Sequence, residues 1–135
     1  MEQTNTEQLK NWLKSKIDVG EGIRIGSIDG NAKQFIGVYR KEVAGGARIC
    51  LGGAAQTLTE TLRADILVHW SQSAVQAEQK AQEVWQLFYG LTNTDMDGAT
   101  VYCADAGASP IPLGKDEKGI HEFCIRVTLT CKRSE

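Results

Sequence analysis

The sequence predicts an α+β domain in which a single, mostly antiparallel sheet is covered on one face by two helices. The first observation is a strand pattern at residues 61–70 that runs directly into an amphipathic helix pattern ending near residue 90. A second helix pattern occupies residues 6–17, and a long alternating pattern occupies residues 121–132. The expected order is α-β-β-loop-β-α-β-β, which forms one layer of helices on one sheet.

Residues 61–90 form the unit around which the rest of the sheet is expected to assemble. Apolar and polar side chains alternate along the strand, with Ala64, Ile66, Val68 and Trp70 on one face and Arg63, Asp65 and His69 on the other. In the helix that follows, Ser73 is positioned to accept a hydrogen bond from the backbone N–H of Gln76. The apolar positions of this helix begin with alanines and end with Trp85 and Phe88. This order predicts close packing on the sheet at the helix start and a wider gap, filled by rings, at its end.

The N-terminal region predicts a helix followed by a hairpin. The helix is indicated by apolar residues at helical spacing, namely Leu9, Trp12, Leu13 and Ile17. Residues 23–28 and 35–40 are two β-rich runs on either side of a turn signal, Asp29-Gly30-Asn31. The two runs are therefore expected to pair antiparallel.

Residues 44–60 are rich in glycine and alanine and show no clear period, which predicts a flexible loop. We expect this loop to be mobile in the free subunit and to become ordered against a neighbour, because small side chains bury too little surface to offset ordering. Its candidate contact residues are Gly45, Gly46, Arg48, Gly52 and Gly53. Neither glycine pair is followed by Lys-Ser/Thr, so a phosphate-binding loop is not indicated.

The C-terminal third predicts two more strands. A turn at residues 95–98 precedes a strand at 99–104, and that turn lacks the twelfth-position Glu of a calcium loop. Pro110 and Pro112 restrict the next extended piece to a sheet edge or a loop, because proline cannot donate to a ladder. A polar turn bounded by glycines then leads into the strand at 121–132, which is expected to lie beside the central strand.

Length and composition indicate one globular domain over residues 1–135. The net charge of −2 gives no basic footprint for nucleic acid. No apolar run approaches the roughly 18 residues of a membrane span, and the N-terminus does not resemble a signal peptide. We therefore expect a protein of the cytoplasm.

The residues that could carry chemistry form no recognisable motif. The four cysteines could make two disulfides or one metal site, but no pair has metal-ligand spacing, and buried free thiols are favoured: Cys50, Cys103, Cys124 and Cys131. His69 and His121 stand beside no nucleophile motif, although a Cys–His pair made by the fold stays open. No catalytic residue, metal or cofactor is therefore expected.

Three stretches together resemble a known group of proteins. They are DILVHWS at 65–71 leading into AEQKAQEV at 77–84, then DGATVY at 97–102, then PIPLGKDEKGI at 110–120. In this order they resemble the minor capsid or tail-completion proteins of tailed phages and prophages, which are similar in fold to tail terminators. The resemblance covers nearly the whole chain, and the sequence departs from the group in having cysteines at 103, 124 and 131 where larger apolar residues would be expected.

The resemblance implies a non-enzymatic virion protein of the tail, assembled in the cytoplasm of the bacterial host. Such a protein caps or completes the tail tube, as a homo-oligomeric ring of six, and contributes to head-tail joining. Its partners would be the tail tube protein and a head-completion protein, with DNA passing through the ring without sequence-specific binding and with no membrane. Beside the loop, the candidate interface residues are the charged ones on the uncovered sheet face: Arg63, Asp65, Arg126 and Lys132. The alternative is a small α+β ligand-binding domain or enzyme, which a histidine in a deep pocket would favour.

Overall fold

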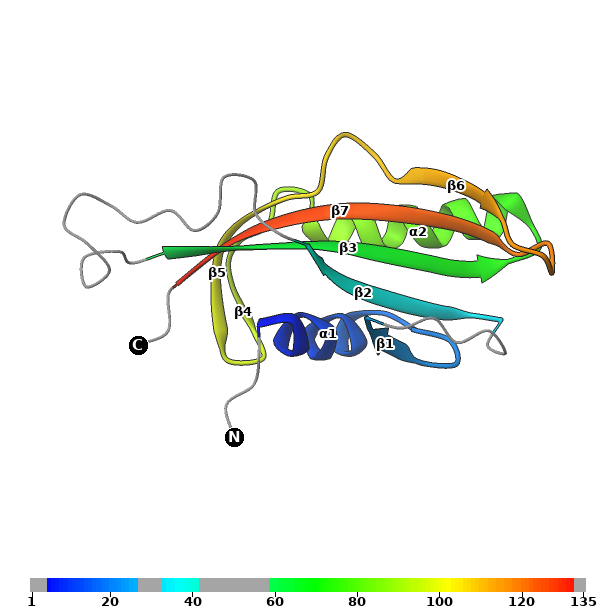
Figure 1. Cartoon of the computed structure of the whole chain (residues 1–135). Helices are drawn as coiled ribbons and strands as arrows, with labels where there is room; N and C mark the ends of the chain where they lie inside the picture. Colours follow the sequence, from blue (N-terminus) through cyan, green and yellow to red (C-terminus); the bar gives the residue numbers. More distant parts are fainter. Residues whose placement is uncertain (1–4, 27–32, 42–58, 133–135) are drawn as a thin grey trace.

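A computed structural model describes residues 5–26, 33–41 and 59–132 of the chain (Figure 1). These residues form two helices and a curled, mostly antiparallel sheet of seven strands, which confirms the α+β prediction. The elements are α1 (Asn5–Lys16), β1 (Ile23–Ile25), β2 (Phe35–Lys41), β3 (Thr59–Ser71), α2 (Ala74–Phe88), β4 (Thr92–Met96), β5 (Ala99–Asp105), β6 (Ile111–Lys115) and β7 (His121–Lys132). No helix among the described residues is long and apolar enough to cross a membrane.

Strands β3 and β7 form the centre of the sheet. They run antiparallel side by side, from Thr59 opposite Lys132 to Ser71 opposite His121, as Figure 1 shows. The strand order is β1-β2-β3-β7-β5-β4, and β6 pairs with β7 outside this path. One edge of β7 therefore contacts β3 along its length, whereas its other edge pairs with β6 over residues 121–124 and with β5 over residues 128–131.

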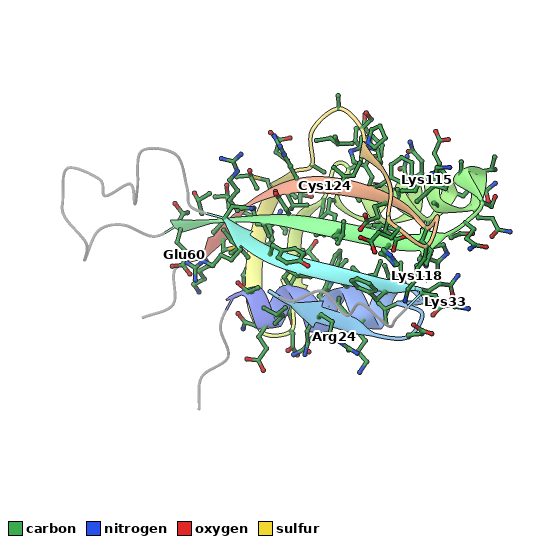
Figure 2. All side chains as sticks on the ribbon, turned by 45° about the vertical axis from the view of Figure 1, so that its right-hand side comes forward. Arg24, Lys33, Glu60, Lys115, Lys118 and Cys124 are labelled. Atoms are coloured by element: carbon green, nitrogen blue, oxygen red, sulfur yellow. The ribbon has the colours of Figure 1, made fainter. Side chains whose placement is uncertain are left out.

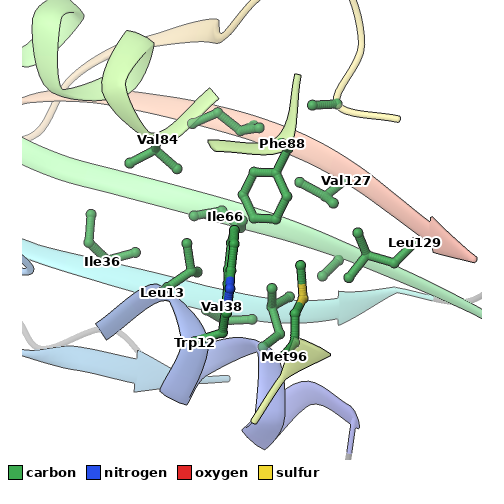
Figure 3. Packing of buried hydrophobic residues seen from close by; sticks show 14 of the residues in the cluster. Trp12, Leu13, Ile36, Val38, Ile66, Val84, Phe88, Met96, Val127 and Leu129 are labelled. Carbon is green, nitrogen blue, oxygen red and sulfur yellow. The ribbon is translucent and has the colours of Figure 1, made fainter. Parts of the chain in front are cut away.

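Both helices pack on the same face of the sheet, and they meet through the rings of Trp12 and Phe88, whose centroids are 5.5 Å apart. Figure 3 shows these rings with side chains of the strands in one cluster. The largest fully buried residues of this core are Leu9, Leu13, Ile36, Val38, Ile66, Val68, Val84, Phe88, Met96, Ile125 and Leu129. The alternation predicted for both central strands thus places their apolar sets under the helices, where their burial supplies most of the driving force for folding.

Helix α2 begins as the sequence predicts, because the Ser73 side chain accepts from the backbone N–H of Gln76 at 3.4 Å. Its alanines at 77 and 81 lie fully buried against the sheet. At the aromatic end, Phe88 is fully buried but Trp85 is only partly so, and its Nε1 donates to the Gly107 carbonyl at 3.3 Å. The helix also buries Lys80, whose Nζ lies 4.6 Å from the centre of the Trp70 ring and 3.3 Å from Glu83 Oε2. A cation–π contact and an ion pair therefore compensate the burial of a charge that stands on the same helix face as Ala77 and Val84.

The antiparallel hairpin predicted for residues 23–28 and 35–40 is wrong, because β1 pairs with β2 in parallel. After α1 the chain turns sharply, and the Glu21 backbone N–H donates to the Gln34 carbonyl at 2.7 Å. This bond places the start of β1 beside the start of β2, so the two strands run in the same direction. Gly20 permits the approach, since its φ is +67° and an added Cβ would lie 2.7 Å from the Cβ of Gln34. The turn predicted at 29–31 lies outside the described residues.

Strand β4 was not expected, and one boundary moves. Strand β4 forms a hairpin with β5 around Asp97 and Gly98, which confirms the predicted turn. The proline-containing piece is strand β6 at the outer edge of β7, as the prolines predict. Thr59 and Glu60, placed in the flexible loop, are instead the first residues of β3. The rest of that loop, residues 44–58, lies outside the described residues.

Candidate interface on the open sheet face

The sheet face opposite the helices, called here the open face, carries the charged residues that the sequence analysis predicts as interface residues. Ladder register and strand alternation place on it Phe35, Tyr39 and Lys41 of β2, Arg63, Asp65, Leu67 and His69 of β3, and Glu122, Cys124, Arg126, Thr128 and Lys132 of β7. Figure 2 shows Cys124 near the middle of the sheet, with Glu60 at one end and Lys33 and Lys118 at the other. Cys124 therefore marks the middle of the sheet, and the other three residues mark its two ends.

At the centre of the open face, Asp65 of β3 lies directly opposite Arg126 of β7. On its other side Asp65 is 3.8 Å from the Nζ of Lys41, measured from Oδ2. Arg63 is opposite Lys41 in one ladder and opposite Thr128 in the other. The fold thus brings together three of the predicted residues, and adds Lys41, which the sequence did not single out because its strand pairing depends on β2.

The other predicted residues are not part of this charged centre. Lys132 is opposite Thr59 at the far end of the ladder, six residues beyond Arg126, which is about 20 Å along a strand. The loop candidates Gly45, Gly46, Arg48, Gly52 and Gly53 lie outside the described residues. The geometry therefore supports one compact charged cluster, made by Lys41, Arg63, Asp65 and Arg126.

Beside the charged centre, the open face is more apolar than the alternation suggests. Phe35 and Leu67 are buried there, with Tyr39 packed against them. The Tyr39 ring lies over Gly37, where an added Cβ would be 2.9 Å from the ring carbon Cε2. Burial, with the Glu122 charge as a smaller cause, raises the pKa of Tyr39. The hydroxyl therefore stays neutral at physiological pH.

The thiol of Cys124 joins the apolar part of the face to the charged centre. Burial raises the pKa of Cys124, and the Asp65 carboxylate adds to the shift, while Arg126 opposes it by charge and hydrogen bonding. A half-buried thiol with a raised pKa is a poor nucleophile. Cys131 is buried in the core as predicted, but Cys103 is exposed, so the prediction of a buried thiol is wrong there; Cys50 lies outside the described residues.

His69 is not on a free polar surface, as its place in the sequence suggested, but is 5% exposed. Its Nδ1 is 2.9 Å from the backbone carbonyl oxygen of Lys33, and its Nε2 is 2.8 Å from Asp116 Oδ2. The ring stacks on Phe35 with centroids 4.8 Å apart. Because the turn after β6 folds over this end of β3, a histidine on the nominally open face becomes covered.

Asp116 connects this histidine to the turn between β6 and β7. Its Oδ1 accepts from the backbone N–H groups of Lys118 and Ile120, both at 2.9 Å. The hydrogen bond from His69, followed by that from the Ile120 N–H, lowers the pKa of Asp116. The carboxylate is therefore ionised at neutral pH and holds the turn and the histidine together.

This arrangement suits a structural joint better than catalysis. Both ring nitrogens of His69 already face acceptors, so neither is available to take a proton from a substrate. Within the described ranges, no group of three or more His, Cys, Asp or Glu side chains could hold a metal ion. Sequence reasoning missed the pair because Asp116 is 47 residues from His69, and only the turn after β6 brings them together.

Comparison with known protein families identifies a match over most of the chain. A family model described as bacteriophage tail terminator protein matches residues 13–133. The match includes the whole sheet, the charged cluster on the open face and the His69–Asp116 pair. None of the curated proteins compared with the chain matches it.

Proposed function

The chain belongs to the family of bacteriophage tail terminator proteins, and from this premise we propose that it caps the growing tail tube as a closed ring of six copies. The family makes it a structural component of the phage tail. We infer that its role is non-enzymatic and that the ring also offers a surface for head-tail joining. The family match is the single observation that carries this proposal, and the fold and the open face support it.

The charged cluster on the open face supports contact with another protein surface. Asp65 stands among three cations, Lys41, Arg63 and Arg126, in the space of three adjacent strands. A patch with both signs can complement a partner patch of the opposite arrangement, which sets register and excludes other orientations. In a ring, neighbouring subunits meet through two different surfaces, so no self-complementary apolar seam is required. We propose that the cluster contacts the neighbouring subunit.

The remaining partners follow from the same proposal. The tail tube protein would contact one rim of the ring and a head-completion protein the other, with DNA passing through the lumen without sequence-specific binding. We propose that Lys132, which lies apart from the charged cluster in the ladder, contacts one of these partners. The glycine-rich residues 44–58, which join Lys41 to the strand of Arg63, are proposed as a second contact. Assembly would take place in the cytoplasm of the bacterial host, and the free protein would be a monomer or weak oligomer.

The test is control of tube length. The purified tube protein is polymerised with and without this protein, and the tubes are imaged by negative-stain electron microscopy. We expect this protein to stop elongation and to form a ring at one tube end. Tubes that grow equally long in both samples, with bare ends, would refute the capping role.

The enzyme or ligand-binding alternative receives no support from the histidine that would favour it. His69 is covered and has both ring nitrogens bonded, rather than directed into an open pocket.

A further inference from the structure

Strand β6 and the turn after it, residues 111–120, form a segment that we call the strap. All residues of β6 are exposed, including Ile111 and Leu113, and β6 pairs only with the first residues of β7. The pairing is interrupted by a register shift between Pro112 and Gly114. The strap is therefore held by few ladder bonds and depends on its contacts at the turn.

Two contacts tie the turn of the strap to the end of β3 and the start of α2. One is the His69–Asp116 pair, and the other is a 3.0 Å hydrogen bond from Gln72 Nε2 to the Lys118 carbonyl. The first is charge-assisted, because the Asp116 carboxylate is the acceptor, and charge-assisted bonds are the stronger kind. His69 also reaches the segment before β2 through the Lys33 carbonyl.

We propose that His69 is a protonation-dependent latch that fastens the strap to the sheet. The carbonyl of Lys33 and the carboxylate of Asp116 can only accept hydrogen bonds. A neutral imidazole has one N–H and can satisfy one of them, whereas a protonated imidazole donates to both. The latch is complete in the protonated state and loses one of its two bonds when the ring releases its proton.

The groups around His69 favour this behaviour. From β7, Glu122 lies directly opposite His69, and from the turn comes Asp116. The Phe35 ring comes from β2 and the Lys33 carbonyl from the segment before it. Burial raises the pKa of Glu122, and His69 opposes that shift. On β3 itself the neighbours on this face are Leu67, which is uncharged, and then Asp65. The charged side chains of Lys33 and Lys118 belong to the same end of the sheet (Figure 2).

Loss of the proton has a defined structural result in either tautomer. If Nε2 gives up its hydrogen, a lone pair faces the Asp116 carboxylate, and the turn of the strap separates from β3. If Nδ1 gives up its hydrogen, the Lys33 carbonyl loses its donor, and the segment before β2 loosens instead. The strap should accordingly be most firmly attached on the acidic side of the imidazole titration, as long as Asp116 remains ionised.

Nuclear magnetic resonance of the free protein tests the latch, independently of any tail assembly. Long-range ¹H–¹⁵N spectra report the protonation of each imidazole nitrogen between about pH 5 and 8, while amide exchange reports the opening of residues 111–120. We expect both nitrogens of His69 to be protonated at the acidic end. As the ring deprotonates, protection of the strap or of residues 33–35 should fall about tenfold, after correction for base-catalysed exchange. Protection along the β3–β7 centre should not change.

Two variants decide whether the effect belongs to this pair. Asp116→Asn should remove most of the pH dependence of strap protection, and His121→Gln should retain it. His121 is the matched control, because it lies opposite Lys115 at the same end of the sheet and is the other histidine of the chain. Protection that is independent of His69 protonation in the wild type, or that depends on His121 instead, would overturn the proposal. The wild-type titration alone suffices if a variant does not fold.

Discussion

Asp65 and Arg126 lie opposite each other on the two central strands, at the middle of the face that the helices leave open. Lys41 approaches the same carboxylate from the other side, at 3.8 Å. The ion pair between Asp65 and Lys41 is long, and the Lys41 side chain is 52% exposed, so water screens the pair and it contributes little to folding. The arrangement of these charges is therefore more informative about contact with another protein than about stability.

Reversing either charge should impair ring formation without unfolding the subunit. We expect Arg126→Asp, at an exposed position, to leave the free energy of unfolding within about 1 kcal/mol of the wild type, and Asp65→Arg, at a partly buried one, to lower it further without unfolding the subunit. Each should nevertheless give tubes that are not capped, because like charges then meet at the subunit contact. Denaturant midpoints and tube lengths are the two measurements.

The double variant Asp65→Arg/Arg126→Asp separates two explanations. It restores opposite signs within the subunit but presents a reversed pattern to the neighbour, so we expect capping to remain impaired. Recovery of capping in the double variant would mean that the pair acts within one subunit. Lys14→Glu, on the exposed side of α1, is the control and should cap normally.

Phe88 should matter more to stability than Trp85, although both end the same helix pattern. Phe88 is fully buried against Trp12, so Phe88→Ala should cost about 3–5 kcal/mol of unfolding free energy. Trp85 is partly exposed, and Trp85→Ala should cost clearly less. Urea denaturation of both variants measures the difference, and an equal loss would contradict the packing described for α2.

Glu122→Gln should stabilise the protein near neutral pH. Burial raises the pKa of Glu122 in the folded state, so the unfolded chain ionises this carboxyl at lower pH than the folded chain does. The wild type therefore loses stability as the pH rises from the unfolded pKa through the folded pKa, while the glutamine variant does not. The gain should be below about 1 kcal/mol, because the carboxyl is only partly buried and solvent screens it.

Urea midpoints across the acidic range measure this gain. The two proteins should be alike at a pH well below the ordinary pKa of glutamate, where both side chains are neutral, and should diverge above it. A constant difference at every pH would show that the amide acts through packing rather than through charge.

The cysteines should react at very different rates. Burial, with smaller contributions from Glu60 and Cys103, raises the pKa of Cys131 to about 11, so almost no thiolate exists at pH of about 8. Cys103 is exposed. Iodoacetamide should therefore modify Cys103 quickly and Cys131 only as the protein unfolds, as peptide mapping would reveal. Rapid labelling of Cys131 in native buffer would contradict its place in the core. In urea, Cys103 and Cys131 should be labelled at similar rates.

Much of the fold is predictable where a local period determines which side chains are buried. The patterns of α2, β3 and β7 predict their faces correctly, and the prolines predict the edge position of β6. The direction of β1 is not predictable in this way, because it depends on a bond between Glu21 and Gln34. Strand β4 is missed because Met96 is its single buried residue, which leaves no alternation to recognise.

The candidate interface shows the same division between local and non-local information. Strand alternation places Arg63, Asp65 and Arg126 on one face, and the register then brings them together. The joint between His69 and Asp116 needs a turn in a distant segment to fold over the sheet, and no local pattern indicates that. The charge that Lys41 adds likewise depends on the pairing of β2 with β3.

The central position of β7 also affects how the protein is made on the ribosome. Among the described elements β7 is the last to be synthesised, yet it is the strand that joins β3 to β5. Until it emerges, the nascent chain has two strands whose inner edges lack a partner, and unpaired edges are prone to pair with other chains. A pause in translation shortly before residue 121 would prolong this state. The yield of folded protein should therefore depend on how fast the final strand is delivered.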